Sequence, residues 1–106
     1  MAFQLGSALM DACVLAVLSR GDTYGYILTQ QVREIMDISE STLYPVLRRL
    51  QKDGCLETYD QPFQGRNRRY YKVTEKGKEK YKQYLEEWED YKLRIDKILL
   101  GGIGDE

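Results

Sequence analysis

Apolar side chains recur at helical spacing in three stretches of the first half of the chain. The first, over residues 9–18, is apolar on most sides and ends at Arg20-Gly21, a basic last turn followed by a helix stop. A second helix is expected to reach Met36, with Ile35 among its inward-facing residues. A third ends at Gly54 and carries one apolar stripe, made of Leu43, Val46, Leu47 and Leu50.

The start of the third helix is ambiguous because a proline lies near it. Either Ser39 or Ser41 could cap the helix through its hydroxyl. If Ser39 is the cap, Pro45 removes a backbone donor after the first turn. The sequence therefore predicts either a local kink at Pro45 or a helix that begins near Ser41.

After the third helix the pattern changes to that of two short strands, residues 55–59 and 67–73, which are rich in β-branched and aromatic residues. Residues 60–65 between them contain Pro62 and Gly65, which predicts a hairpin loop longer than a tight turn. Alternation along the second strand places three side chains on one face of the hairpin, namely Arg68, Tyr70 and Lys72.

A long fourth helix is expected from Thr74, its N-cap, to about Leu100, where two glycines stop it. Its apolar positions are spaced by three and four residues, as in a coiled-coil seam, and are Tyr81, Tyr84, Trp88, Tyr91, Ile95 and Ile98. We expect this seam to form a dimer interface. The alternative is that it packs on the first helix of its own chain.

These elements predict a mainly α fold with a small β-hairpin, of the α+β class. Residues 1–74 would form a winged helix-turn-helix for DNA binding, and residues 75–106 a C-terminal dimerisation helix. A length of 106 residues makes both parts one compact unit.

Composition removes several classes of chemistry. There is no histidine, which is the commonest general base and metal ligand. Cys13 and Cys55 are isolated and fit core positions in a reducing cytosol. No phosphate-loop, dinucleotide-binding or nucleophile-elbow motif occurs. We expect no cofactor, no metal and no enzymatic activity.

Neither a membrane span nor an export signal is predicted. No apolar run approaches the roughly 18 residues that cross a bilayer. The N-terminus lacks the basic start and the cleavage site of a signal peptide. We therefore expect a cytoplasmic protein without a membrane partner.

The formal net charge of −1 hides a local asymmetry. Residues 48–72 contain seven basic and three acidic side chains, a net charge of +4, so the rest of the chain carries −5. This asymmetry indicates an anionic partner for the basic segment. Nucleic acid fits, because only the contacting face has to be basic.

Several short motifs follow one another along the chain: Tyr24-Gly25-Tyr26, Ser41-Thr42-Leu43-Tyr44-Pro45, Leu47, Arg49-Leu50, Gly54, Arg68-Arg69-Tyr70-Tyr71, Val73-Thr74 and Gly77. Together they resemble the signature of PadR-family transcriptional regulators, and the resemblance covers essentially the whole chain. A single helix after the wing resembles the short subfamily, whose members dimerise through that helix.

Leu85-Glu86-Glu87-Trp88 resembles the aromatic-x-x-Trp motif of the multidrug-responsive members of that subfamily. In those proteins the tryptophans of two subunits line a pore at the dimer interface and sandwich flat aromatic drugs. The chain departs from that pattern after Trp88, where Glu89-Asp90 and roughly one extra helical turn intervene. The exit of the pore is therefore not carried over.

The DNA-contacting residues would come from the third helix and the wing. A recognition helix presents its N-terminal side chains to base edges, and an outward arginine such as Arg48 pairs bidentately with guanine. Arg49 could instead brace the fold. The wing would lie along phosphates or enter a minor groove. The expected set is Tyr24, Ser41, Thr42, Tyr44, Arg48, Arg66, Arg68 and Lys72.

A second site is expected near Trp88, the only tryptophan. Ala12 and Ala16 are one turn apart and leave space. The resemblance implies that they face the same cavity as Leu85 and Trp88, which would bind a planar aromatic or phenolic effector. The alternative is that Trp88 anchors the dimer without a ligand.

The sequence therefore predicts a homodimeric regulator that binds double-stranded operator DNA. It would be a repressor relieved by a planar aromatic molecule at the dimer interface. Two alternatives are a winged-helix regulator without a small-molecule effector, and a winged-helix module that binds protein or RNA.

Overall fold

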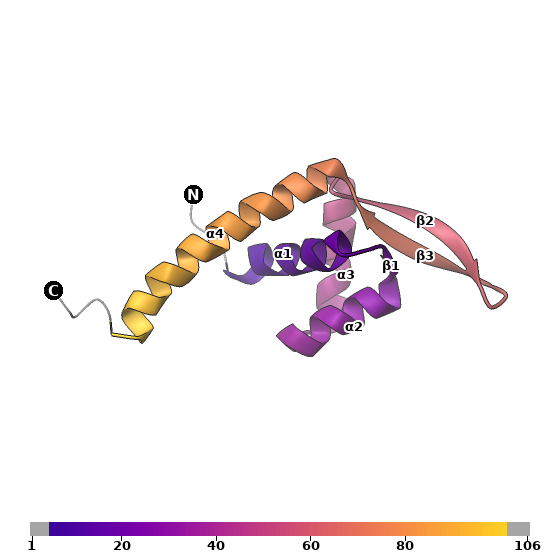
Figure 1. Cartoon of the computed structure of the whole chain (residues 1–106). Helices are drawn as coiled ribbons and strands as arrows, with labels where there is room; N and C mark the ends of the chain where they lie inside the picture. The colour runs from indigo at the N-terminus through magenta and orange to yellow at the C-terminus, as the bar shows by residue number, and fades with distance from the viewer. Residues whose placement is uncertain (1–4, 102–106) are drawn as a thin grey trace.

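The computed structural model describes residues 5–101. Its elements, in chain order, are α1 (Leu5–Ser19), β1 (Thr23–Tyr24), α2 (Gly25–Met36), α3 (Glu40–Lys52), β2 (Leu56–Phe63), β3 (Arg66–Val73) and α4 (Glu75–Leu99). The first three helices form a body, from which the β2–β3 hairpin extends as an arm on one side (Figure 1). The α4 helix lies beside α1, at an angle to it, and projects on the other side (Figure 1). The predicted α+β winged-helix arrangement is confirmed.

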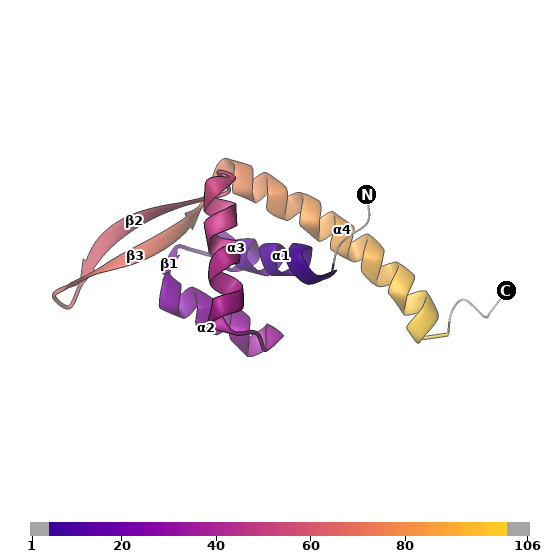
Figure 2. The same ribbon diagram turned by 180° about the vertical axis from the view of Figure 1, so that it is seen from behind.

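The core lies where α1, α2 and α3 meet the base of the hairpin, and α3 crosses in front of α1 in the reverse view (Figure 2). The four residues of the predicted third-helix stripe are all buried. Ile35 is 83% exposed, so the prediction that it faces inward is wrong. It shares a helix face with buried Leu28 and Val32 but lines an open pocket beside the end of α1, whereas its neighbour Met36 packs against the core.

The α3 helix begins at Glu40, and its N-cap is Ser39, whose hydroxyl accepts a hydrogen bond from the Thr42 amide at 3.2 Å. The predicted start near Ser41 is therefore wrong. Pro45 lies inside the helix. Pro45 has no N–H to donate to the carbonyl of Ser41, four positions earlier, and Ser41 is an exposed residue, at which water can replace that donor.

The wing is longer and its turn tighter than the sequence predicts. Only Gln64 and Gly65 separate β2 from β3, and their φ angles of 52° and 80° are those of a type I′ hairpin turn. The predicted loop over residues 60–65 is wrong because Pro62 is part of β2. The sheet order is β1-β3-β2, so β2 is an edge strand, where a proline need not donate to the ladder.

The start of α4 is fixed to the base of the wing. Thr74 is its N-cap, as predicted: the hydroxyl accepts from the Gly77 amide at 3.0 Å and donates to the Gly54 carbonyl at 2.6 Å. Gly77 is buried against the Cys55 carbonyl, where a side chain would collide. None of the helices in residues 5–101 is long and apolar enough to span a membrane.

Candidate nucleic-acid interface and apolar groove

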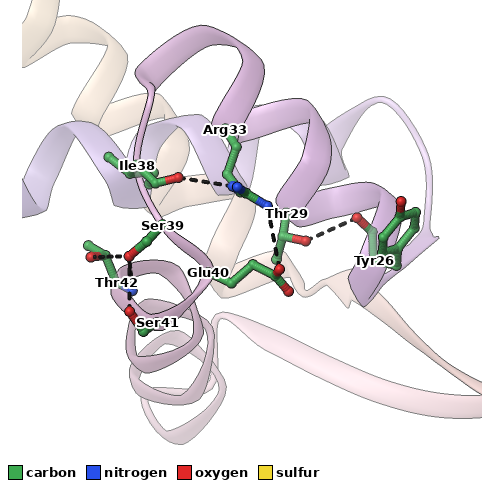
Figure 3. Close-up of polar contacts among 8 residues, drawn as sticks. All are labelled: Tyr26, Thr29, Arg33, Ile38, Ser39, Glu40, Ser41 and Thr42. Atoms are coloured by element: carbon green, nitrogen blue, oxygen red, sulfur yellow. Dashed lines mark hydrogen bonds and ion pairs between the residues drawn. The ribbon is translucent and has the colours of Figure 1, made fainter.

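The corner between α2 and α3 is held by a compact set of polar contacts (Figure 3). The Ser39 hydroxyl lies 3.0 Å from the hydroxyls of both Ser41 and Thr42. Arg33 donates to the Ile38 carbonyl at 3.0 Å and pairs with Glu40 at 3.4 Å. Ser41 and Thr42 are exposed, so the N-terminal turn of α3 presents hydroxyls from a fixed backbone.

An open pocket separates α3 from the wing. It is lined by Tyr24, Gly25, Tyr26, Tyr44, Arg68, Arg69 and Tyr71, so it brings together three residues of the expected DNA-contacting set. Burial raises the pKa of Tyr71, the nearby Tyr44 phenol adds to this, and the charges of Arg69 and Arg48 oppose it. Arg48, which is exposed on α3, is therefore an electrostatic neighbour of the wing.

Aromatic rings cover one face of the three-stranded sheet. Tyr70 stacks on Tyr59 with ring centroids 5.5 Å apart and meets Tyr24 edge-on at 5.6 Å. The guanidinium of Arg68 lies 4.3 Å from the Tyr24 ring centroid and 4.2 Å from that of Phe63. The tip of the wing is thereby tied to β1.

The remaining basic residues of the wing differ in their surroundings. Arg66 is exposed beside the turn, and Arg69 pairs loosely with Asp60 at 3.8 Å. Lys72 lies opposite Glu57 at the base of the hairpin, away from the pocket. The strongest unpaired positive charge therefore lies toward the tip of the arm.

A buried carboxylate joins three helices. Asp11 on α1 accepts hydrogen bonds from Arg49 on α3 at 2.7 and 2.9 Å, and from the Tyr84 hydroxyl on α4 at 2.9 Å. Burial is the main cause that raises the pKa of Tyr84, and the bond to Asp11 adds to it. This geometry shows Arg49 bracing the fold.

An apolar groove of about 270 Å³ lies between α1 and α4. Its walls include all four residues of the expected ligand site, and the full lining is Leu9, Ala12, Cys13, Ala16, Tyr81, Tyr84, Leu85 and Trp88. Burial raises the pKa of the Cys13 thiol, so the thiol is neutral at physiological pH. Trp88 and Tyr91 are in tilted contact, with ring centroids 6.5 Å apart.

The apolar seam of α4 divides into two halves. Tyr81 and Tyr84 pack against the core of their own chain, as the alternative interpretation of the seam expects. Farther along, Tyr91 and Ile95 are half-buried. The end of the helix carries apolar side chains that are 60–78% exposed, namely Leu93, Ile98, Leu99 and Leu100.

Sequence reasoning missed Asp11 and Phe63. The signal for Asp11 was a lone carboxylate in an otherwise apolar helix, a position that requires a buried partner. Phe63 was hidden by the assignment of residues 60–65 to a loop. Among residues 5–101, no three His, Cys, Asp or Glu side chains are grouped to hold a metal ion.

The chain matches a known family over most of the described residues. Residues 14–83 match the PadR-like family of transcriptional regulators. The chain belongs to this family. Its four helices and small antiparallel three-stranded sheet match the PadR winged-helix structures. PadR proteins are DNA-binding transcriptional regulators and not enzymes. The family therefore confirms the prediction of a DNA-binding regulator and the prediction that the chain is not an enzyme.

Individual relatives agree with the PadR assignment. The solved structure of smu.1704 from Streptococcus mutans is 42% identical, has a TM-score of 0.85 and aligns over 95% of each chain. A PadR-like transcriptional regulator from Bacillus cereus is 27% identical, with a TM-score of 0.81 over 92% of this chain and 97% of that one. Transcriptional regulator Rv3488 of Mycobacterium tuberculosis is 40% identical over 58 residues, 54% of each chain.

Proposed function

We propose that this PadR protein is a homodimeric repressor that a planar aromatic molecule releases from operator DNA. Residues 1–74 would bind DNA, and residues 75–106 would pair two copies, as in the short subfamily that the sequence resembles. The observation that carries the proposal is the groove between α1 and α4, because one of its lining residues, Tyr84, is bonded to the carboxylate that holds α3.

The DNA contact would combine α3 with the wing. Ser41 and Thr42 are exposed at the N-terminal turn of α3, from which a recognition helix contacts base edges. Arg48, exposed farther along, is the strongest candidate for reading guanine. Tyr24 and Tyr44 line the pocket between α3 and the wing, where a phenol can bond a phosphate. Arg66 and Arg68 would follow the backbone, with a smaller contribution from Lys72 opposite Glu57.

The dimer contact would use the half of α4 that the chain does not cover itself. The exposed apolar side chains from Leu93 to Leu100 form a surface of the kind that marks protein interfaces. Tyr91, Ile95 and Ile98 continue the same heptad spacing toward this surface. Trp88 stands at the junction of the two halves, so a second copy would close the groove around its ring.

The ligand site would be the groove and its counterpart in the second copy. The small side chains of Ala12 and Ala16 leave room on the α1 side of the groove. Leu85 and Trp88 supply apolar surface on the α4 side. An aromatic molecule stacked on Trp88 would also meet the ring of Tyr84. The Tyr84 hydroxyl reaches Asp11, and Asp11 holds Arg49 on α3. The ligand weakens DNA binding to the extent that it favours a pose of α4 that does not fit the operator.

The direct test is a fluorescence titration of the full chain, because Trp88 is its only tryptophan. The probes are rhodamine 6G, a planar aromatic cation, and p-coumaric acid, a phenolic acid. The proposal expects saturable quenching at one probe per two chains and a loss of duplex affinity with the same midpoint. Trp88→Ala removes the fluorescence signal itself, so its readout is duplex affinity, which the probes should no longer lower while the dimer persists. Ile35→Ala, exposed on α2 and outside both the groove and α4, should retain quenching.

Other outcomes separate the alternatives. Quenching without any change in duplex affinity would refute the release mechanism. No quenching by either probe, with Trp88 shielded from iodide, would make Trp88 a dimer anchor and favour a regulator without a small-molecule effector.

A further inference from the structure

The guanidinium of Arg68 lies between two aromatic rings that approach it from neighbouring strands. Its central carbon is 4.3 Å from the Tyr24 ring centroid and 4.2 Å from the Phe63 ring centroid. Because β3 is the middle strand, Tyr24 on β1 and Phe63 on β2 belong to the two strands that flank the strand of Arg68. Two cation–π contacts therefore fix the orientation of this charge.

The N–H groups of Arg68, in contrast, have no hydrogen-bond acceptor within residues 5–101. Within residues 5–101 this guanidinium makes no hydrogen bond and no ion pair, whereas the neighbouring Arg69 is paired with Asp60 at 3.8 Å. The donors of a guanidinium lie in its plane, so rings stacked on the faces leave the edge available. A fixed cation with unused in-plane donors is suited to bind an anionic oxygen, such as that of a DNA phosphate.

The two rings also restrict which part of a duplex Arg68 can reach. The minor groove of B-DNA is about 6 Å wide, and a guanidinium flanked by a ring on each side is wider than that. A phosphate on the outside of the duplex presents no such limit. We propose that Tyr24 and Phe63 are positioning residues that hold Arg68 as a preformed phosphate contact. This inference rests on the proposed function, because it requires the wing to lie on duplex DNA.

The test measures the affinity of the full chain for a fluorescent duplex that the protein has selected from a randomised pool, across a series of salt concentrations. Arg68→Gln should weaken binding and reduce the slope of log K against log salt by about 1.8, because each chain of the dimer loses one phosphate contact worth about 0.9. Phe63→Leu keeps the charge and loses one ring. It should weaken binding by the dimer about five- to thirtyfold, as one lost cation–π contact in each chain predicts, with an unchanged slope.

Two further variants serve as controls. Phe63→Tyr keeps an aromatic ring at this position and should bind the duplex as tightly as the unaltered chain. Arg94→Gln removes an equal charge from the far end of α4, where it pairs with Asp90, and should leave the slope unchanged. Thermal unfolding of each variant shows whether the wing variants remain folded.

Equal affinities for Phe63→Leu and the unaltered chain would overturn the inference while the proposed function stands. A loss on Arg68→Gln that is confined to duplexes with A·T-rich minor grooves would also overturn it, because it would place Arg68 inside the groove. Failure of the unaltered chain to select any duplex would refute the proposed function and this inference with it.

Discussion

The carboxylate of Asp11 accepts hydrogen bonds from both terminal nitrogens of Arg49, 38 residues away along the chain. The Asp11 side chain is 4% exposed and that of Arg49 43%, so the pair runs from the inside of α1 to the surface of α3. With the hydrogen bond from Tyr84, one buried charge connects α1, α3 and α4. Within residues 5–101, Asp11–Arg49 is the only side-chain ion pair between α1 and α3.

The two partners should differ in what their removal costs. Arg49→Leu leaves the buried Asp11 carboxylate without its cation and should lower the free energy of unfolding by about 3 kcal/mol. Asp11→Asn keeps an acceptor for Tyr84 and leaves Arg49 within reach of water, so its cost should be about 1–2 kcal/mol. Urea unfolding followed by circular dichroism measures both values. Equal unfolding midpoints for both variants and the unaltered chain would show that the pair does not stabilise the fold.

The Tyr84 phenol should make the protein sensitive to alkaline pH. Its pKa is raised in the folded state, mainly by burial, whereas a tyrosine in the unfolded chain ionises near pH 10. The stabilisation is therefore complete below about pH 10 and declines as the pH rises toward the folded pKa. Across that range the unfolded state has lost a proton that the folded state retains, a slope of about −1.4 kcal/mol per pH unit.

Tyr84→Phe isolates this contribution, because every other ionisable group is common to both chains. The variant should be about 1 kcal/mol less stable at neutral pH, since it loses the bond to Asp11. Its stability should then fall less steeply above about pH 10. The measurement is the free energy of unfolding from urea titrations at a series of alkaline pH values. Parallel curves for the two chains would contradict the prediction.

Gly77 should be irreplaceable even by alanine, although alanine is the better helix former by about 1 kcal/mol. A methyl group at this position would collide with the Cys55 carbonyl and lie 2.7 Å from a methyl of Val73. Because backbone cannot yield, Gly77→Ala should lower the free energy of unfolding by about 1–3 kcal/mol. Lys78→Ala, at the exposed next position, is the control and should change it by less than about 0.5 kcal/mol. A stabilised Gly77→Ala protein would mean that α4 starts farther from β2.

Local chemistry in the sequence was sufficient for the helices and the start of α4. The apolar stripe of the third helix is buried, and Thr74 caps the fourth helix as its hydroxyl predicts. The errors arose where tertiary context overrides local preference. Pro62 reads as a loop residue, but an edge strand accepts it, and Gln64 adopts a positive φ although it is not the residue that type I′ turns favour.

The sequence could indicate which residues belong to the candidate site, but not which of them are in contact. The resemblance to the multidrug-responsive members, together with the one-turn spacing of Ala12 and Ala16, placed these alanines near Trp88, and the groove contains all three. No local pattern pairs Asp11 with Arg49 or places Phe63 over Arg68, because these contacts depend on how α1 meets α3 and on where β2 ends. Arg68 could be recognised as basic and solvent-facing, but not as a stacked cation.

Ser39 and Ser41 offer a matched pair that separates folding from DNA binding. The Ser39 hydroxyl accepts from the Thr42 amide at 3.2 Å, so Ser39→Ala should lower the free energy of unfolding by about 1 kcal/mol. The Ser41 hydroxyl bonds no backbone group of residues 5–101 and contacts only that of Ser39, so Ser41→Ala should change stability by less than about 0.5 kcal/mol.

Duplex affinity should show the opposite order for the same two variants. Ser41 is exposed on the turn of α3 that the proposed function places against base edges, so Ser41→Ala should bind the selected duplex more weakly than Ser39→Ala at a temperature where both are folded. Urea unfolding and fluorescence anisotropy give the two quantities on the same samples. The reverse result, with Ser39→Ala the weaker binder and Ser41→Ala the less stable protein, would contradict the assignment of the helix cap to Ser39 and of the DNA contact to Ser41.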